Sequence, residues 1–159
     1  MRLTTFTDYA LRVLLVLAGD ATRRATIDSF ATDFGISSAH LMKVSVVLGR
    51  TGWVETIRGR NGGLQLAVDP ATLRLGQMVR QLEADFALVE CFADRGNCLL
   101  AGGCGLETAI AKALEAFTRE LDQVTLADLV RTTPRLSFLP SWQPISVPVS
   151  QREKTRRRT

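Results

Sequence analysis

The fold of this chain is decided by residues 26–68, which have the sequence TIDSFATDFGISSAHLMKVSVVLGRTGWVETIRGRNGGLQLAV. The first half of this stretch predicts two helices, over 27–33 and 38–50, each preceded by a threonine or serine that can cap its N-terminus. Gly35 lies between them and permits a sharp turn. Two helices joined by a short turn that contains glycine are typical of a helix-turn-helix.

The second half of the stretch predicts a β-hairpin. Residues 53–57 and 64–68 have strand-like patterns, and an Asn-Gly turn signal lies between them. The glycine-rich tip joins strand to strand and matches neither the P-loop nor the dinucleotide fingerprint, so nucleotide binding is not expected. Its side chains Arg58, Arg60 and Asn61 are instead suited to phosphates or to a DNA minor groove. The whole stretch therefore predicts a winged helix-turn-helix that binds DNA.

Helical patterns dominate the remainder of the chain, so the predicted fold is mainly α with one small β-hairpin. The further helices are expected over 5–18, 73–82, 106–121 and 125–130. Proline-rich and basic sequence then favours a flexible tail over 132–159. We therefore expect a DNA-binding domain over 1–70, a loop with a long dimerisation helix over 71–131, and the tail.

The long helix expected over 106–121 has an apolar stripe at helical spacing. The residues of this stripe are Ile110, Leu114, Phe117 and Leu121. The stripe suits a partner helix in a homodimer. Two heptads are few for a coiled coil, so packing on its own domain is the alternative.

Composition and charge restrict the class of protein. Of the 159 residues, 46% are hydrophobic and 23% are charged, as a globular domain requires. The net charge is +4, but residues 67–150 have seven basic and ten acidic side chains, so the positive excess is confined to the two ends. A protein that wraps nucleic acid with a uniformly basic surface is thereby excluded. No apolar run is long enough to span a membrane and no signal peptide is recognisable, so we expect a cytoplasmic protein.

The three cysteines of the chain lie in one glycine-containing loop. Cys91, Cys98 and Cys104 form a C-x6-C-x5-C pattern. Structural zinc sites prefer closely paired cysteines and four protein ligands, so zinc is the weaker prediction. A catalytic thiol would need a neighbouring base, and the only histidine, His40, lies in the helix expected over 38–50, so no enzyme activity is expected.

Thiolates are preferred ligands of iron–sulfur clusters, and glycines in the loop allow several thiolates to converge. We therefore expect an iron–sulfur cluster, 2Fe–2S or 4Fe–4S. Because the chain has only three cysteines, the fourth ligand must be another kind of group. The alternative is that no cluster is bound and that the three cysteines are small side chains buried in the hydrophobic core.

Five segments together resemble one known family. They are MRLTTFTDYALR (1–12), RGRNGG (58–63), VRQLE (79–83), the cysteine loop and LDQVTLADLV (121–130). On these segments, residues 1–131 are similar to the Rrf-type winged-helix transcription regulators, and within that family to the repressors that sense nitric oxide. The cluster-assembly regulators of the family have a histidine three residues after the third cysteine, where this chain has Glu107.

The resemblance implies that Asp8, contributed by the partner subunit, is the fourth ligand of the cluster. Glu107 and Glu90 are the substitutes within the chain. The residues also allow a purely structural role, because Asp8 stands three positions after Thr5, where a carboxylate completes a capping box.

The resulting hypothesis is a homodimeric repressor with one iron–sulfur cluster per subunit, bound to an imperfect inverted repeat in double-stranded DNA. The helix over 38–50 would lie in the major groove. The candidate contacts are Ser38, His40 and Lys43 in that helix, with Arg12, Arg58 and Arg60 on phosphates or in the minor groove. Nitrosylation of the cluster by nitric oxide would break the bond to Asp8 and release the DNA.

Three other functions remain open at this point. The first is a regulator that senses cluster supply or redox state, and the second is a repressor stabilised by zinc. The third is a cluster carrier in electron transfer, for which the wing would be incidental.

Overall fold

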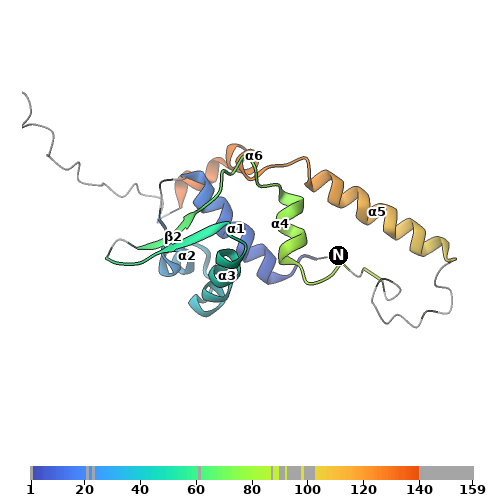
Figure 1. The fold of residues 1–159 in the computed structure, drawn as a ribbon, viewed down its shortest axis with the longest axis horizontal. Coiled ribbons are helices and arrows are strands. Elements are labelled where there is room, and N and C mark those ends of the chain that lie inside the picture. Colours follow the sequence, from blue (N-terminus) through green and yellow to red (C-terminus); the bar gives the residue numbers. More distant parts are fainter. Residues whose placement is uncertain are drawn as a thin grey trace, which may run out of the picture.

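The computed structural model of the chain is mainly helical and contains one β-hairpin (Figure 1). It describes residues 2–20, 22, 24–60, 62–86, 88–89, 92, 98 and 103–139. Within these ranges the elements are α1 (Thr5–Gly19), α2 (Ile27–Phe34), α3 (Ser38–Arg50), β1 (Val54–Ile57), β2 (Gly63–Leu66), α4 (Leu75–Leu82), α5 (Gly105–Leu121), α6 (Leu126–Arg131) and the 3-10 helix η2 (Pro134–Phe138).

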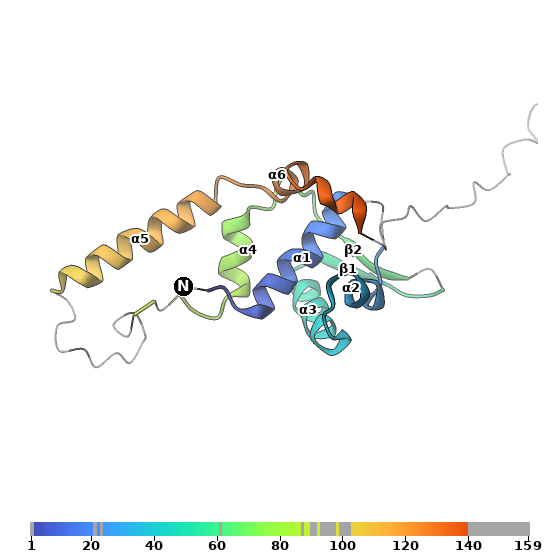
Figure 2. The same ribbon diagram turned by 180° about the vertical axis from the view of Figure 1, so that it is seen from behind.

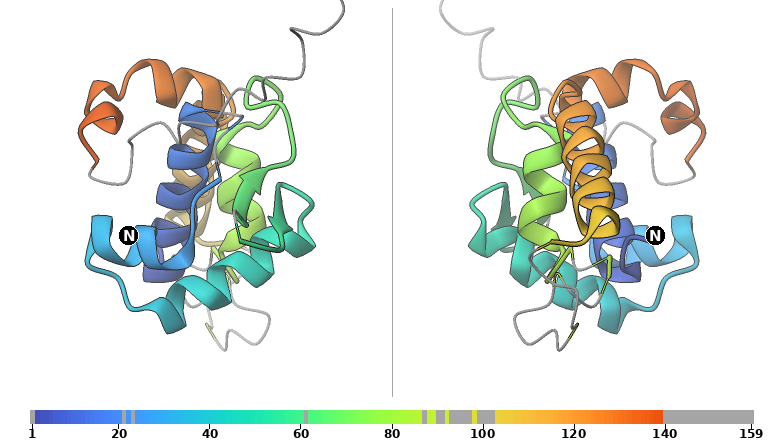
Figure 3. Two further views of the ribbon diagram at one scale, coloured as in Figure 1. Left: turned by 90° about the vertical axis from the view of Figure 1, so that its left-hand side faces the viewer. Right: turned by 90° about the vertical axis from the view of Figure 1, so that its right-hand side faces the viewer.

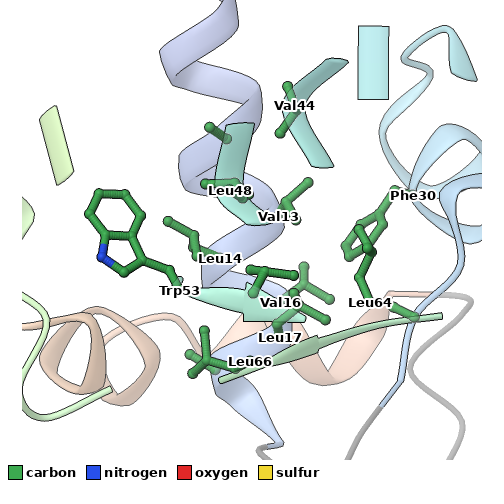
Figure 4. Packing of buried hydrophobic residues seen from close by; sticks show 14 of the residues in the cluster. Val13, Leu14, Val16, Leu17, Phe30, Val44, Leu48, Trp53, Leu64 and Leu66 are labelled. Carbon is green, nitrogen blue, oxygen red and sulfur yellow. The ribbon is translucent and has the colours of Figure 1, made fainter. Parts of the chain in front are cut away.

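Helix α1 is the centre of the hydrophobic core. Val13, Leu14 and Leu17 on its inner face are each at most 1% exposed. Helices α3, α4 and α6 and strand β2 all contact α1, and Figure 4 shows side chains of α2, α3 and the hairpin converging on it. Each fully buried side chain of this size stabilises the fold by about 1.5–3 kcal/mol. A displacement of α1 therefore moves the elements around it.

The predicted helix-turn-helix is confirmed as α2, a turn and α3. Gly35 ends α2 with φ 64°, a left-handed conformation that glycine adopts without a steric penalty. Ser37 caps α3, because its hydroxyl accepts a hydrogen bond from the His40 backbone N–H. The inner face of α3 is formed by Leu41, Val44 and Leu48, all at most 1% exposed.

The predicted wing is confirmed as the antiparallel hairpin of β1 and β2. Val54 pairs with Leu66 and Ile57 with Gly63, so the strands lie within one or two residues of the expected positions. Leu64 and Leu66 point into the core, and Ala25 forms an additional bridge to Leu64. This packing holds the hairpin beside α3, so that its tip extends away from the core (Figure 2).

Helix α5 extends away from the rest of the molecule in Figures 1 and 2. None of its side chains is buried in the single chain, including the predicted apolar stripe. Its C-terminal end is anchored to α4. Arg80 forms a bidentate contact with Asp122, with Nη1–Oδ2 and Nη2–Oδ1 distances of 3.0 and 2.7 Å, and Leu75 N–H donates to the Val124 carbonyl at 2.8 Å.

After α5 the chain returns to α1 (Figure 3). Thr125 begins α6 with a capping box that involves Asp128. Leu136 of η2 is buried in the core, so the first part of the stretch expected as a tail is a packed segment. Residues 140–159 lie outside the described residues, and the division into three parts stays a prediction. Within the described ranges, no helix has both the length and the apolar character needed to cross a bilayer.

Gly76 of α4 packs against Asp122, the C-cap residue of α5. A Cβ atom there would collide with the Asp122 carboxylate and would lie 3.1 Å from the Asp122 backbone nitrogen. We expect Gly76→Ala to lower the free energy of unfolding by about 1–3 kcal/mol through overpacking. Thermal unfolding measures this effect. Gly105→Ala is the matched control at the start of α5, because its Cβ meets nothing within 4 Å. Equal stability of the two variants would contradict the prediction.

Candidate functional site

Two of the three predicted thiol ligands lie in the described residues. Cys98 is exposed, and Cys104 is the N-cap residue of α5, whose side chain accepts no hydrogen bond from the helix backbone. Both thiols are free of disulfides. The N-terminal end of a helix favours negative charge, so a metal-bound thiolate at Cys104 is stabilised there. Cys91 lies outside the described residues.

The chemistry of these donors fits an iron–sulfur cluster. Both described thiols are outside any disulfide, Cys104 lies at the start of α5, and sulfur is the donor that iron–sulfur clusters require. Within the described ranges, no three histidine, cysteine or acidic side chains gather into a metal-binding group. The complete ligand set therefore stays a prediction.

Asp8 lies in the first turns of α1, and its predicted capping role is wrong. Thr4 is the N-cap residue, and its hydroxyl accepts a hydrogen bond from the Thr7 N–H at 3.2 Å. The Asp8 carboxylate instead pairs with Arg12, with Nη2–Oδ2 and Nε–Oδ1 distances of 2.7 and 3.1 Å. Because the Asp8 side chain remains 46% exposed, a second protein chain can reach it.

The structure separates Asp8 from Cys104 and brings Glu107 close to that cysteine. Asp8 lines a surface hollow with Tyr9, Arg12 and the turn after α2, whereas Cys104 and Glu107 line a different hollow at the start of α5. Glu90, the other substitute, lies outside the described residues. Within one chain, only Glu107 of the predicted oxygen ligands is placed beside a described cysteine, and Asp8 would have to come from a second chain.

The start of α1 is attached to the end of α4. The Thr4 backbone N–H donates to Glu83 Oε1 at 2.7 Å, and the Thr4 hydroxyl donates to the same oxygen at 3.1 Å. Glu83 is the C-cap residue of α4, and the cysteine loop begins shortly after it. The turn that carries Asp8 is thus held by the segment that leads to the cysteines.

The predicted DNA contacts divide into two groups. Ser38, Arg58 and Arg60 are exposed on α3 and the wing, as a DNA contact requires, and Asn61 lies outside the described residues. Arg12 is also exposed but is paired with Asp8 and lies 5.9 Å from the centre of the Phe34 ring.

His40 and Lys43 lie on the side of α3 that faces α1. The His40 ring is 6.2 Å from the Tyr9 ring, and its Nδ1 lies 3.0 Å from the Ser37 hydroxyl. Lys43 lines the same apolar hollow as His40, together with Phe6 and Tyr9. These two residues therefore sit at the junction between α1 and α3 rather than at the centre of the outward face of α3.

The outward face of α3 presents two large apolar side chains that the sequence reasoning left out. Met42 is 58% exposed and Val46 is 53% exposed. Helical periodicity predicts their exposure, because both residues fall opposite Leu41, Val44 and Leu48 on a helical projection. Polarity alone does not single them out, because neither side chain forms hydrogen bonds.

Asp122, at the end of α5, and Asp128, in the first turn of α6, both have lowered pKa values. The hydrogen bond from Arg80 lowers the pKa of Asp122 below its usual value, and the same contact raises the pKa of Arg80. Hydrogen bonds from the Thr125 hydroxyl and backbone lower the pKa of Asp128. Both carboxylates are therefore ionised at neutral pH and serve the structure rather than the candidate ligand set.

Comparisons with known proteins agree with this geometry. Residues 3–132 match the family described as "Rrf2: Iron-dependent Transcriptional regulator". The HTH-type transcriptional regulator NsrR of Geobacillus kaustophilus is 49% identical over 141 residues, which cover 87% of this chain and 96% of that protein. The NsrR protein of Bacillus subtilis is 46% identical over 133 residues, covering 82% and 91%. The solved structure of T. potens IscR has a TM-score of 0.67 at 25% identity, and covers 84% of this chain and 88% of its own.

Proposed function

The chain belongs to the Rrf2 family of iron-dependent transcriptional regulators, and from this membership we propose that it is a homodimeric repressor that senses nitric oxide through one iron–sulfur cluster per subunit. Its relatives are transcription regulators and not enzymes. The observation that carries the proposal is the position of Cys104, which lies at the far end of the helix that projects from the winged-helix domain.

The winged helix binds double-stranded DNA through α3 and the wing. An α-helix fits the major groove, and α3 carries His40, Lys43 and Arg50 but no acidic residue. Arg58 and Arg60 at the wing tip contact phosphates or enter the adjacent minor groove. The two subunits of a dimer place two copies of α3 on the halves of an imperfect inverted repeat.

The homodimer forms through α5. This helix has an apolar stripe but no buried residue in the single chain, and Leu106 at its start is 62% exposed. Pairing with a second copy of α5 covers this surface, which a monomer would leave in water.

Cys91, Cys98 and Cys104 would hold the cluster, and Asp8 of the partner subunit would supply an oxygen ligand. When bound, the cluster would supply iron, the element with which nitric oxide reacts. Asp8 contributes a hard carboxylate, which is a weaker ligand for iron in such a cluster than the soft thiolates. Because Asp8 belongs to α1 and the cysteines belong to the loop before α5, the bond to Asp8 couples the two parts of the dimer. Loss of this bond would uncouple them and lower the affinity for the operator.

The test is anaerobic native mass spectrometry during a nitric oxide titration, followed by DNA binding on the same samples. We expect a dimer with two iron–sulfur clusters whose affinity for operator DNA falls as nitric oxide adds to the clusters. A colourless protein with stoichiometric zinc would overturn the proposal in favour of a zinc-stabilised repressor. A cluster-containing protein without sequence-specific DNA binding would favour a carrier.

Arg60 of the wing is expected to contribute charge to DNA binding without choosing the sequence. Arg60→Ala should weaken operator binding and reduce the magnitude of the slope of log K against log salt by about 1, because one phosphate contact is lost. Fluorescence anisotropy at several salt concentrations measures both quantities. Arg131→Ala is the control, since Arg131 is exposed on α6 and lies outside the proposed interface. An unchanged slope in Arg60→Ala would contradict the wing contact.

A further inference from the structure

The outward face of α3 has an apolar centre and cationic flanks. Ala39, Met42 and Val46 follow one another at spacings of three and four residues, so they lie on one face of the helix. Lys43 and Arg50 are exposed beside this row. The wing adds two exposed arginines, and α3 itself has no acidic residue. A surface of this charge is complementary to the phosphates on both sides of a DNA groove.

Met42 and Val46 are exposed and do not belong to the hydrophobic core of the described part of the chain. The core face of α3 is already complete with Leu41, Val44 and Leu48, each at most 1% exposed. The two large side chains of the row, Met42 and Val46, lie in the middle of α3, which runs from Ser38 to Arg50. The side chains that would reach furthest into a groove are therefore apolar.

The major groove offers one apolar group, the C5 methyl group of thymine. Every base pair presents hydrogen-bonding groups there, but only an A·T pair adds this methyl group, which an apolar side chain can cover. Resting on the proposed DNA-binding function, we infer that Met42 and Val46 are specificity-determining residues that select A·T pairs through thymine methyl groups. Lys43 and Arg50 hold the flanking phosphates, and the apolar row reads the bases between them.

The experiment begins with the full-length, cluster-loaded dimer, which selects its preferred duplexes from a random DNA library under anaerobic conditions. Each thymine of the best duplex is then replaced in turn by deoxyuridine, which removes only the methyl group. At the positions opposite α3 we expect each replacement to raise Kd about fourfold, the value of one buried methyl group. Elsewhere in the duplex the replacement should have no effect.

The double variant Met42→Ala, Val46→Ala assigns the effect to these side chains. Because both residues are exposed and alanine favours helices, the variant should fold normally. Its affinity for the thymine duplex should fall. At the sensitive positions, replacing thymine by deoxyuridine should raise its Kd less than about 1.5-fold, because the variant has already lost the contact with the methyl group. Ser45→Ala is the matched control on the same helix, because it removes a hydroxyl that donates to the Met42 carbonyl and leaves both apolar side chains in place, and it should keep the full response.

Deoxyuridine that has no effect on the parent protein, or an effect that persists in the double variant, would overturn the inference while the repressor function stands. Selection of G·C pairs opposite α3 would overturn it in the same way. A library that yields no preferred sequence would instead overturn the proposed function and this inference together.

Discussion

Serine in place of Cys104 is expected to produce a protein that does not retain the proposed iron–sulfur cluster. Serine oxygen is a harder donor than thiolate sulfur, and Cys104 is the described thiol that the fold fixes at the start of α5. We expect the cluster-bound fraction to fall by about tenfold or more, in line with the large cost of losing a metal ligand. DNA affinity should then no longer respond to nitric oxide. Anaerobic visible absorption and native mass spectrometry measure the cluster directly.

Glu107→Gln is the matched control for Cys104→Ser. Glu107 lines the same hollow as Cys104 and is the rival oxygen ligand within the chain. If Asp8 of the partner subunit is the fourth ligand, Glu107→Gln should bind the cluster as the parent does. A cluster that survives in Cys104→Ser but is lost in Glu107→Gln would refute the proposed ligand set.

The second large effect is expected from Asp8→Ala. The three thiolates remain, so a cluster should still be bound, but the proposed bond between the cluster and α1 cannot form. Coupling between two sites typically changes affinity 5–150-fold. In Asp8→Ala we expect nitric oxide to change the Kd for operator DNA by less than about threefold. Stability should hardly change, because an exposed pair such as Asp8 with Arg12 contributes only about 0.3–0.5 kcal/mol. Operator titrations before and after nitric oxide measure the response.

Loss of the Arg12 partner must be separated from loss of the ligand. Arg12→Ala breaks the same ion pair but leaves the Asp8 carboxylate in place. This variant should bind DNA more weakly both before and after nitric oxide is added. The ratio of the two dissociation constants should stay that of the parent protein. Asp8→Asn keeps an acceptor for Arg12 and should behave like Asp8→Ala. The coupling route is wrong if nitric oxide releases Asp8→Ala as sharply as the parent protein.

Much of the fold follows from local signals in the sequence. Helix α3 has the expected bounds, because Ser37 caps its start and Gly52 follows its end. The turn at Gly35 and the order of strands are equally local. The N-cap of α1 was displaced by one residue, since Thr4 and Thr5 have the same capping chemistry and only the tertiary contact with Glu83 distinguishes them.

The candidate site was less predictable because it depends on contacts between distant segments. Spacing could not show that Asp8 pairs with Arg12 or that His40 faces Tyr9. The hydrogen bond from Thr4 to Glu83 joins residues 79 positions apart, and no pattern in the sequence predicts it. The cysteines were recognisable because their chemistry, and not their packing, identifies them.

Helix α5 has the mechanical form of a cantilever. Arg80 and the backbone contacts of α4 clamp its C-terminal end to the body of the molecule, whereas Cys104 lies at the opposite tip. Seventeen residues make an arm about 25 Å long, at about 1.5 Å per residue. A tilt of about 5° at the clamp moves the tip of such an arm by about 2 Å. Force applied at the cysteine end thus has the greatest leverage over α4, and through α4 over the helix at the centre of the core.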